Sequence, residues 1–557
     1  MSNIVDCLII GHNEMDFVEY EKNIRKMGKD SGAYRDLNLS FICHNNIPHH
    51  ASGIFNLLCK NSKTSLSHGE SFSAAIAYLG TYLYRRGFTF DYINSFQDEK
   101  DVLAEKLKKE NILTIAITTT LYVSVFPILE IVDFIKRRNR SAKIIVGGPF
   151  VSTQVRNVNA VTSTYLFNSI GADVYVNSSQ GEATLVKIID ALKNERPLNR
   201  ISNIYYKTEN RSYTSTPVIR ENNRLSENMV DWSLFSHRVG EYVVLRTSIS
   251  CPFSCAFCGF PEHAGKYQTA NVKAIEEELD SLGTIESVKS IYFIDDTFNV
   301  PMNRFKEILR MMIKNKTKFK WHSNFRCQFA DREMVDLMKA SGCEGVFLGI
   351  ESGNDQILKN MNKSANIEKY LEGIAMLKEA GIITYGSFII GFPGETSETL
   401  QDTVRFIEES GVDLYRAQLW YCEPITPIWK MREKYKITGS NFEWAHATMD
   451  AKTAANLVEE MFLSIKNSLW VPQYGFDFCN LFHLTNRGID WGKIKNFIRS
   501  FNEGIKDKLI NPSVTEVSAE VMNRIKNALI LDDSHYSAIM TDKPGEEDDD
   551  LIIDFEL

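Results

Sequence analysis

Three cysteines stand close together in the middle of this 557-residue chain: Cys251, Cys255 and Cys258, within Ser250-Cys-Pro-Phe-Ser-Cys-Ala-Phe-Cys-Gly259. Thiolates are soft ligands that select zinc or iron-sulfur clusters. A structural zinc site normally closes four protein ligands around the metal, and this segment offers three cysteines with no close fourth. The spacing therefore favours a four-iron cluster, in which three irons are held by cysteine and the fourth stays open for another ligand.

Two other interpretations of the cysteines are open. A zinc knuckle would need His263, five residues beyond Cys258, as its fourth ligand. Disulfides would need an oxidising compartment, but the chain shows no secretory n-region and h-region and its other seven cysteines are scattered. We therefore expect a reducing, cytoplasmic location.

Six apolar runs with helix-like segments between them begin at the cysteine region. Such alternation predicts strand-helix units that form a partial (β/α)6 barrel. The predicted strands are Tyr242–Thr247, Ser290–Ile294, Lys320–Asn324, Gly345–Ile350, Ile383–Ile390 and Leu414–Tyr421. Reactive residues of parallel barrels gather where strands end and loops begin, so the residues that follow each run are the candidates for chemistry.

Polar or glycine-rich residues follow the predicted strands. The second strand leads into Asp295 and Asp296, the third into Arg326, the fourth into Glu351, and the fifth into Ile390-Gly391. Singly these features have plain alternatives, since an Asp pair also caps a helix and an arginine at a strand end is often a surface residue. As an ordered set they indicate a binding site at one end of the barrel.

The cysteine spacing, with an aromatic residue just before the last cysteine, resembles the cluster loop of the radical S-adenosylmethionine (SAM) superfamily. In that family the open iron binds the amino and carboxylate groups of SAM, and reduction releases a 5'-deoxyadenosyl radical. The resemblance implies carboxylates at the second strand end on the SAM amino group, an acid after the fourth strand on the ribose, and a glycine turn beside adenine. An arginine after the third strand can pair with the SAM carboxylate. The implied SAM-binding set is Phe257, Asp295, Asp296, Arg326, Glu351, Ile390 and Gly391.

Residues 60–200 form a second alternating unit upstream. Its apolar runs end in Thr118-Thr119-Thr120, Gly147-Gly148-Pro149 and Gln180-Gly181-Glu182. The pattern is typical of a Rossmann-like, doubly wound α/β fold, whose ligands bind at the carboxyl ends of the strands. No G-x-G-x-x-G fingerprint is present, so a nicotinamide cofactor is unsupported.

Directly upstream of such a barrel, this unit resembles the cobalamin-binding domain of the B12-dependent radical SAM branch. By that resemblance Thr118, Thr119, Thr120, Gly147, Gly148, Pro149, Gly181 and Glu182 lie where the branch cradles the corrin and its nucleotide tail. Glycine lets the backbone approach a flat ligand closely. The Asp-x-His-x-x-Gly motif that supplies a lower histidine to cobalt elsewhere is absent. His68 is the only imidazole in the loop expected below the corrin, with a capping or exposed role as its alternative.

The ends of the chain complete the expected organisation. Near the start, Asp6–Ile10 and Leu37–Cys43 are predicted strands on either side of a helix at Met15–Met27. The expected divisions are an N-terminal extension and cobalamin-binding domain at 1–200, a linker at 201–240, the barrel at 241–435, a mostly helical C-terminal cap at 436–540 and an acidic tail at 541–557. The tail carries eight acidic residues and one lysine from Asp542 to Leu557, a net charge of -7 out of -8 for the chain. We expect it to be solvated or to face a partner.

Composition limits the function classes. With 44% hydrophobic residues the chain can bury more than one sizeable core. It has no apolar run of the roughly 18 residues that a membrane span needs, and it shows no basic face for nucleic acid. We expect a small-molecule substrate, an external one-electron reductant, and neither membrane nor nucleic-acid partners.

The opening residues, including Asp30–Ser40, resemble the P-methyltransferase group of phosphinothricin tripeptide biosynthesis. The resemblance implies a B12-dependent radical SAM methyltransferase of natural-product biosynthesis, using a [4Fe-4S] cluster, SAM and cobalamin. A methyl group would pass from methylcobalamin to phosphinate phosphorus or to carbon. Alternatives are a B12-dependent cyclase or rearrangement enzyme, a tRNA methylthiotransferase, and a B12 or iron-sulfur sensor. Cys422, after the sixth strand, is a candidate catalytic thiol, although free cysteines are usually inert and buried.

Overall fold

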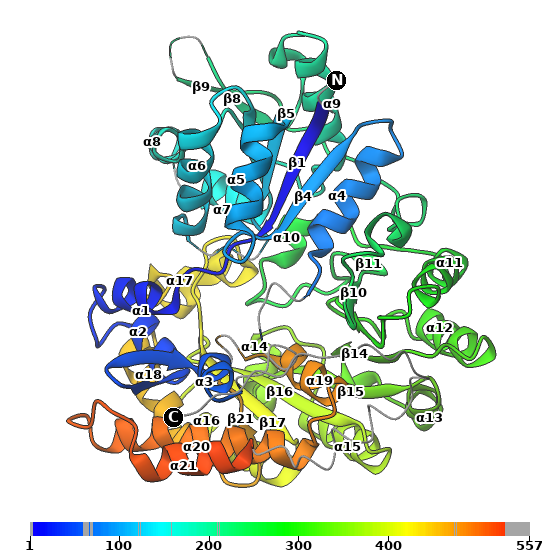
Figure 1. Cartoon of the computed structure of the whole chain (residues 1–557). Coiled ribbons are helices and arrows are strands. Elements are labelled where there is room, and N and C mark those ends of the chain that lie inside the picture. Colours follow the sequence, from blue (N-terminus) through cyan, green and yellow to red (C-terminus); the bar gives the residue numbers. More distant parts are fainter. Residues whose placement is uncertain are drawn as a thin grey trace, which may run out of the picture.

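The computed structural model describes residues 4–529, apart from 60–65, 67–70, 121, 123, 158, 209, 211, 473 and 475. His68 and the acidic tail, both singled out in the sequence, therefore lie outside the described residues. Two seven-stranded sheets dominate the described chain, the first in the upper half of Figure 1 and the second in the lower half.

The first sheet has the strand order β4-β1-β5-β6-β7-β8-β9. Its strands are β1 (Ile4–His12), β4 (Phe90–Ser95), β5 (Asn111–Thr118), β6 (Lys143–Gly147), β7 (Val174–Val176), β8 (Ile204–Lys207) and β9 (Tyr213–Ser215). The first five pair in parallel, in the 2-1-3-4-5 order of a doubly wound fold. The run Asp6–Ile10, a predicted strand, thus lies within this sheet between β4 and β5. β8 and β9 form an antiparallel hairpin that continues the sheet beyond β7.

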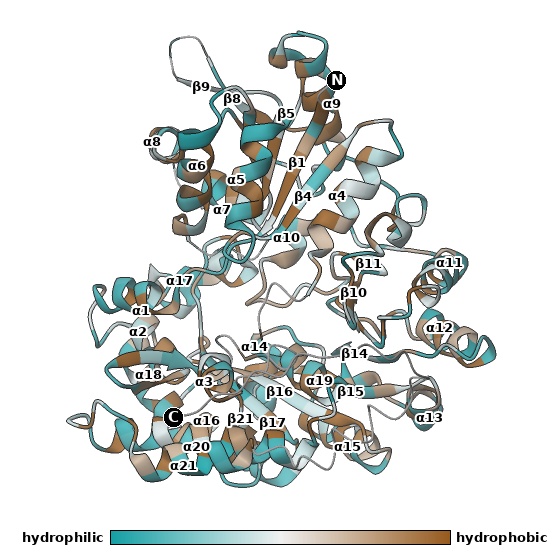
Figure 2. Ribbon diagram, viewed as in Figure 1, coloured by the Kyte–Doolittle hydropathy of each residue, from teal (hydrophilic) through white to brown (hydrophobic). Residues whose placement is uncertain are grey.

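Helices cover both faces of the first sheet. α4 (Ala74–Tyr84) and α9 (Glu182–Lys193) contact β1 on one face. The other face carries α5 (Lys100–Lys109), α6 (Phe126–Arg138), α7 (Pro149–Asn157) and α8 (Ala160–Ile170). Because side chains alternate along a strand, Cys7 and Ile9 of β1 join one apolar core while Leu8 and Ile10 join the other. The middle of the strand, from Cys7 to Ile10, is apolar for this reason, and β1 is mostly brown in Figure 2.

The second sheet confirms the predicted partial barrel. Its strands are β10 (Tyr242–Leu245), β13 (Ser290–Phe293), β14 (Lys320–Phe325), β15 (Cys343–Glu351), β16 (Ile383–Ile390), β17 (Leu414–Leu419) and β21 (Leu469–Trp470). All neighbours are parallel. The six predicted strands are present, and β21 adds a seventh that the sequence did not suggest. The helices that follow the strands are α11 (Val272–Gly283), α12 (Met302–Lys314), α13 (Arg332–Ala340), α14 (Asp355–Asn360), α15 (Ile367–Glu379) and α16 (Ser397–Ser410).

Local sequence explains where these helices begin and end. α16 starts at a capping box in which the hydroxyl of Thr396 accepts from the backbone N-H of Thr399 and the Thr399 hydroxyl accepts from that of Thr396. It ends at Gly411, whose φ of 70° is readily adopted only without a side chain. Asp331 and Asn366 are simple N-caps of α13 and α15. The side chain of each accepts from the backbone N-H three residues further along.

The connection between β1 and α4 is long and belongs spatially to the other end of the chain. It contains α1 (Phe17–Arg25), α2 (Gly32–Asn38), β2 (Phe41–His44), β3 (Ile47–His50) and α3 (Ala51–Leu58). Figure 1 shows these blue elements beside the orange C-terminal helices. The Lys508 ammonium donates to the carbonyl oxygens of Asn38 and Phe41, both at 2.8 Å. We call residues 13–59 the N-terminal insertion.

One sequence prediction in this insertion is wrong. Leu37–Cys43 was expected to be a strand, but α2 extends to Asn38 and only the stretch from Phe41 is extended. The reason is the cap at Ser31, whose hydroxyl accepts from the backbone N-H of Tyr34 and starts a short helix. β2 then pairs with β3 in a separate hairpin rather than joining the first sheet.

The C-terminal region is mostly helical, as predicted, after a small three-stranded sheet. Its elements are α17 (Arg432–Tyr435), β18 (Thr438–Ser440), β19 (Glu443–His446), β20 (Met449–Asp450), α18 (Ala451–Ser464), α19 (Phe478–Asn486), α20 (Trp491–Ile510) and α21 (Ala519–Ala528). α18 and α20 pack on the edge of the second sheet and on the N-terminal insertion. Among the described residues, no helix combines the length and apolar composition needed to cross a membrane.

Candidate active site

The cysteine loop follows β10 and is fixed at both ends. Asp295 holds its start, because its carboxylate accepts from the backbone N-H groups of Thr247 at 2.7 Å and Ser248 at 2.8 Å, and from the Thr247 hydroxyl. Further along, the N-H of Ala256 donates to the carbonyl of Met361 at 2.7 Å. Cys255 is buried, and Cys251 and Cys258 are half-buried. The loop is therefore held in place by the end of β13 and by the C-terminal end of α14.

Asp295 and Asp296 have different surroundings despite their adjacency. The Asp295 side chain is buried and spends both oxygens on the cysteine loop, so it positions that loop. Asp296 is exposed and has no such partners. Desolvation by the surrounding protein raises the pKa of Asp296 to about 7, and the negative charge of the neighbouring Asp295 adds to this effect. Of the two carboxylates, Asp296 is the one open to a ligand.

Arg326 lies against the cysteine loop. Its Nη2 donates to the sulfur of Cys255 at 3.3 Å and its Nη1 to the carbonyl of Lys363 at 3.2 Å. The guanidinium stacks on the ring of Phe253, 3.6 Å from the centroid. The residue is only 6% exposed, so the alternative of a surface arginine is wrong. A cation in this place favours thiolate, the form in which cysteine binds metal.

Glu351 ends β15 in an unusual backbone conformation, with a φ of 70°. Its carboxylate accepts from the ammonium of Lys363 at 2.8 Å, and both side chains are buried. The ammonium also lies over the ring of Phe257, 5.5 Å from its centroid. Lys363 was missed at the sequence level, because nothing in the turn after α14 distinguishes it from the chain's other lysines. It joins the cysteine loop to the fourth strand end.

The turn at Ile390-Gly391 is closed by its own neighbours. The Gly391 N-H donates to a Glu395 carboxylate oxygen at 2.5 Å, and its carbonyl pairs with Nε2 of His446 at 3.0 Å. Gly391 has a φ of 88°, and a Cβ here would lie 2.5 Å from the Trp444 ring. Glycine is therefore required at this position. The Ile390 side chain is fully buried, and Gly391 is buried as well.

The residues present fit a cluster with SAM beside it. Three thiols lie on one anchored loop, with a guanidinium, an ammonium and an open carboxylate around them. Burial raises the pKa of the Cys258 thiol to about 12, so a thiolate there requires nearby positive charge of the kind a metal cluster supplies. Among the described residues, no three Cys, His, Asp or Glu side chains converge on a single ion. His263, the zinc alternative's fourth ligand, has its Nε2 4.0 Å from Glu423.

The carboxyl edge of the first sheet carries the predicted threonines and glycines. The Thr118 hydroxyl donates to the Gly11 carbonyl at 3.1 Å, across the point where the strand order reverses. The Thr119 hydroxyl donates to the Gly147 carbonyl at 3.0 Å. Gly148 has a φ of 117°, and a Cβ on it would lie 2.7 Å from the Thr119 hydroxyl oxygen. The two turns thus interlock and expose backbone at the sheet edge, which fits a flat ligand.

The remaining cobalamin candidates lie along the same edge. Thr120 and Pro149 are exposed beside the interlocked turns. Gly181, with a φ of 84°, precedes α9, and Glu182 is the first residue of that helix. The Glu182 carboxylate accepts from the Asn223 amide at 3.0 Å, and burial raises its pKa. This arrangement gives Glu182 a structural partner within the protein.

The two sheets present their carboxyl edges to a common region. α7, which starts after the Gly147-Gly148 turn, contacts the short helix α10 (Phe260–Ala264) at the end of the cysteine loop. The Arg156 guanidinium of α7 donates to the Glu262 carbonyl of α10 at 2.7 Å. A second contact joins the two parts of the chain: the Tyr78 hydroxyl of α4 donates to the carbonyl of Arg246, just after β10, at 3.0 Å.

Known protein families match both the barrel region and the region of the first sheet. The Radical SAM superfamily model matches residues 245–407, and the B12 binding domain model matches residues 67–166. The chain therefore carries a radical SAM domain and a B12-binding domain. A [4Fe-4S] cluster, SAM and cobalamin are therefore its cofactors, as the sequence resemblance implied.

Relatives of this radical SAM enzyme include methyltransferases and cyclases. It is 26% identical over 336 residues to an uncharacterised methyltransferase of Pyrococcus horikoshii, covering 59% of this chain and 71% of the relative. It is 25% identical to the anaerobic magnesium-protoporphyrin IX monomethyl ester cyclase of Cereibacter sphaeroides, covering 65% of this chain but only 61% of the cyclase. The relatives thus include methyltransferases, the predicted enzyme class, and cyclases, the predicted alternative.

The fold of the chain is similar to that of solved structures. The cobalamin-dependent SAM radical enzyme OxsB, with aqua-cobalamin and SAM bound, superposes with a TM-score of 0.57 at 15% identity. The match covers 96% of this chain and 81% of OxsB. The N-terminal insertion and the C-terminal helices are therefore included in the shared architecture.

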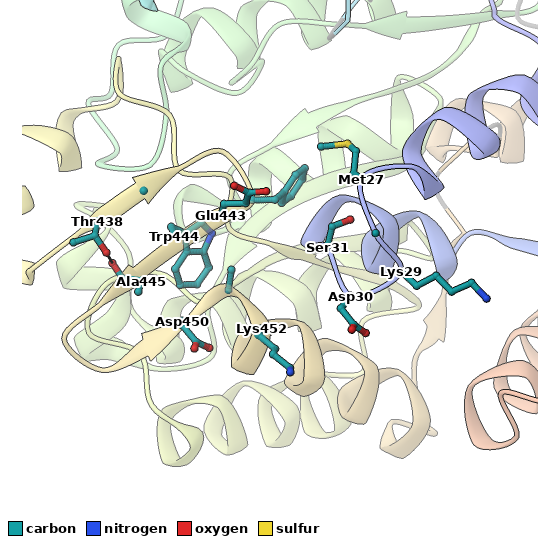
Figure 3. Close-up of a pocket in the computed structure, with 15 residues that line it drawn as sticks. Met27, Lys29, Asp30, Ser31, Thr438, Glu443, Trp444, Ala445, Asp450 and Lys452 are labelled. Carbon is teal, nitrogen blue, oxygen red and sulfur yellow. Dashed lines mark hydrogen bonds between the residues drawn. The ribbon is translucent and has the colours of Figure 1, made fainter.

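Two further features do not belong to the predicted SAM and cobalamin residues. Cys422 is fully buried, and burial raises the pKa of its thiol to about 11, so it presents no thiolate at neutral pH. A surface cavity of about 590 Å³ lies between the α1–α2 connection and the β18–β20 sheet (Figure 3). Its lining mixes the charges of Lys29, Asp30 and Glu443 around Trp444, the residue that packs on Gly391.

Proposed function

We propose that this enzyme transfers a methyl group to an unactivated centre of a natural-product intermediate, with phosphinate phosphorus as the first candidate acceptor and carbon as the second. The observation that carries this proposal is the contact between α7 and α10, through Arg156 and the Glu262 carbonyl. It brings the cobalamin edge of the first sheet next to the cysteine loop. When bound, the cofactors would supply methylcobalamin as methyl donor and a SAM-derived radical that activates the acceptor.

In this proposal, residues 241–435 bind the cluster and SAM through the following residues. Cys251, Cys255 and Cys258 hold three irons. Arg326, already a donor to the Cys255 sulfur, faces the SAM carboxylate, while the open Asp296 takes the amino group. The remaining contacts are Phe257 beside the cluster, Glu351 on the ribose, and the Ile390-Gly391 backbone against adenine.

In the same proposal, residues 1–200 bind cobalamin. The Thr118–Thr120 and Gly147–Pro149 turns lie against the corrin and its tail, and the Gly181-Glu182 step supports them. Buried apolar strands on both sides keep this edge rigid, which serves proximity between the two cofactors and a substrate held between them. An external one-electron reductant is required, and we place the enzyme in the cytoplasm with a small-molecule substrate.

A cyclisation or rearrangement without net methylation is the second candidate. The likeness to the anaerobic magnesium-protoporphyrin IX monomethyl ester cyclase, at 25% identity, supports it. Both reactions use the same two cofactor sites and the same positioning of a substrate between them. The mass of the product distinguishes the two reactions.

The test uses enzyme purified without oxygen and reconstituted with iron, sulfide and hydroxocobalamin. SAM carrying a trideuterated methyl group and a reductant are added with an H-phosphinate substrate or with a carbon-acceptor analogue. A product heavier by one trideuterated methyl group supports methyl transfer. Whichever of the two substrates gains this group identifies the acceptor as phosphorus or carbon. A product of unchanged or lower mass that depends on SAM cleavage would instead favour the cyclase.

A further inference from the structure

A buried arginine on the sixth barrel strand has donors that the protein does not use. Arg416 of β17 is only 2% exposed, and its Nη2 donates to the carbonyl and carboxylate oxygens of Asp36, at 3.4 and 3.1 Å. Its Nε and Nη1 are buried and have no hydrogen-bond partner among the described residues. Buried N-H groups without acceptors destabilise a protein, so these donors indicate a ligand.

The pairing of strands shows that Arg416 faces the barrel interior. On β16, Tyr385 contacts Phe478 of α19 inside the barrel, whereas Phe388 contacts Phe406 of α16 outside it. Ser387, two residues from Tyr385, therefore lies on the inner face. Ser387 is the register partner of Arg416, so the arginine shares that face.

The height of Arg416 in the barrel places it above the apolar floor. The floor is α19, whose Phe482 packs so closely on Gly345 that a Cβ there would lie 2.4 Å from the ring. Gly349 lies four residues further along β15, and it is the register partner of Ser387. Gly349, Ser387 and Arg416 thus form one inner row across three strands. This row lies four residues beyond Gly345, toward the carboxyl ends of the strands.

The same row carries the Glu351 and Lys363 pair. A Cβ on Gly349 would lie 2.7 Å from the Glu351 carboxylate and 3.1 Å from the Lys363 ammonium. Two strand spacings, about 10 Å, separate Gly349 from Arg416 across the sheet. A ligand on Arg416 would therefore extend from the far wall toward the residues assigned to SAM.

A second unsatisfied group lies near the arginine. The hydroxyl of Tyr385 is buried and has no hydrogen-bond partner among the described residues. The Arg416 charge acts on this phenol, as does the charge of Asp477 at the start of α19, although burial dominates and raises its pKa. One face of the guanidinium is covered by the Trp470 ring at 4.3 Å, so its free donors point edgewise.

We propose that Arg416, assisted by the Tyr385 hydroxyl, binds an oxyanion of the substrate, either a carboxylate or a phosphinate. The oxyanion completes the hydrogen bonds of Nε and Nη1 and offsets the charge that Asp36 neutralises only on the Nη2 side. This site fixes the end of the substrate remote from the reacting centre and selects acids over their esters. The inference deepens the proposed function, since it rests on SAM lying beside Glu351.

The test measures binding, without turnover, on holoenzyme loaded with SAM and kept free of reductant. Phenylphosphinate, benzoate and neutral methyl benzoate are the probes, followed by nuclear magnetic resonance titration. We expect both anions to bind at least about tenfold more tightly than the ester, as charge-assisted hydrogen bonds allow. Preference between the anions distinguishes a phosphinate from a carboxylate substrate.

Three variants locate the binding. Arg416→Met should weaken both anions by about tenfold or more and leave the ester unchanged, with Arg416→Lys in between. Tyr385→Phe, which removes only an unpartnered hydroxyl, should weaken the anions by about threefold without disturbing the fold. Asp36→Asn, the control that keeps the shape of the partner, should retain anion binding. Iron, cobalt and SAM content equal to wild type shows that each variant is folded.

The outcomes separate this inference from the proposed function. Anion binding that is absent in wild type, or unchanged in both Arg416→Met and Tyr385→Phe, would overturn the oxyanion site even if methylation is found. Should Arg416→Met fail to fold, Tyr385→Phe and Arg416→Lys still decide. Anion binding that depends on these residues in an enzyme that never methylates would uphold the site and reject methyl transfer.

Discussion

The ammonium of Lys363 lies 2.8 Å from a carboxylate oxygen of Glu351, and both side chains are less than a tenth exposed. Glu351 reaches this position through a left-handed backbone conformation at a β-bulge of β15. A pair so placed is held by neighbours on three sides, the Phe257 ring, Gly349 and the Arg326 guanidinium that bonds the Lys363 carbonyl. It links the geometry of the cysteine loop to the fourth strand.

Removing one member of this pair should be costly. Lys363→Met leaves a buried carboxylate without its counterion, and we expect a loss of about 3–5 kcal/mol in unfolding free energy. Urea unfolding followed by tryptophan fluorescence measures it. The matched control is Arg332→Met, which breaks an ion pair with Glu379 that is more than half exposed and should leave the unfolding free energy nearly unchanged. Equal losses in the two variants would show that the buried pair is not special.

Asp296 should make stability depend on pH. Its folded pKa of about 7 is above the ordinary value of 3.8, so the folded chain binds the proton more tightly than the unfolded chain. Protonation of Asp296 therefore stabilises the folded chain at low pH. This stabilisation is fully present below about pH 4 and is lost as pH rises from 4 to 7. Asp296→Asn should therefore gain stability over wild type across that window in the iron-free protein. Thermal unfolding between pH 4 and 8 measures it, and a constant difference would contradict the raised pKa.

The cluster cysteines and the cobalamin edge should be separable. The triple variant Cys251→Ala, Cys255→Ala and Cys258→Ala should lose the roughly four irons expected of one cluster and keep about one cobalt per chain. The physical reason is that the cobalamin candidates lie on a different sheet, one face of which packs into a core of its own. Metal analysis and absorption spectra after reconstitution measure both. Loss of cobalt together with iron would mean that the two sites do not form independently.

The reciprocal variant changes the first sheet. Gly148→Ala introduces a side chain at a φ of 117° and 2.7 Å from the Thr119 hydroxyl, so the interlocked turns must move. We expect cobalamin retention to fall several-fold while iron is kept. Gly87→Ala is the control, because its φ of 78° is also positive but nothing lies within 4 Å. It should cost roughly 1–2 kcal/mol of stability from backbone strain alone and should leave cobalamin bound.

Local patterns predicted the strands well, because apolar runs bounded by glycine and polar residues identify them wherever they pair. They failed where the partner lies far along the sequence. β21, only two residues long, exists because it pairs with β17 at Leu414 and Tyr415, and such a strand has no periodicity of its own. The strand expected at Leu37–Cys43 was wrong because a cap at Ser31 started a helix first.

In the candidate site, too, local sequence patterns predicted some residues, while others depend on contacts with distant parts of the chain. The cysteines, Asp296 and Gly391 stand at strand ends that the sequence indicates. Lys363 lies in a turn beyond a short helix, and its role comes from a contact with Glu351 across twelve residues and from packing on the cysteine loop. Asp295 was expected to face a ligand, but its buried carboxylate instead organises the backbone of Thr247 and Ser248. Which of two adjacent acids is buried depends on the fold around them.

The contact of Lys508 with the carbonyl of Asn38 spans 470 residues. A ribosome adding about 5–20 residues per second needs roughly half a minute to a minute and a half to make that length of chain. Throughout that interval the N-terminal insertion, which interrupts the first sheet, is without the helix that covers it. The insertion therefore acquires its final packing only after Lys508 has been added to the chain, and the α2 and β2 surfaces that α20 contacts stay uncovered until then.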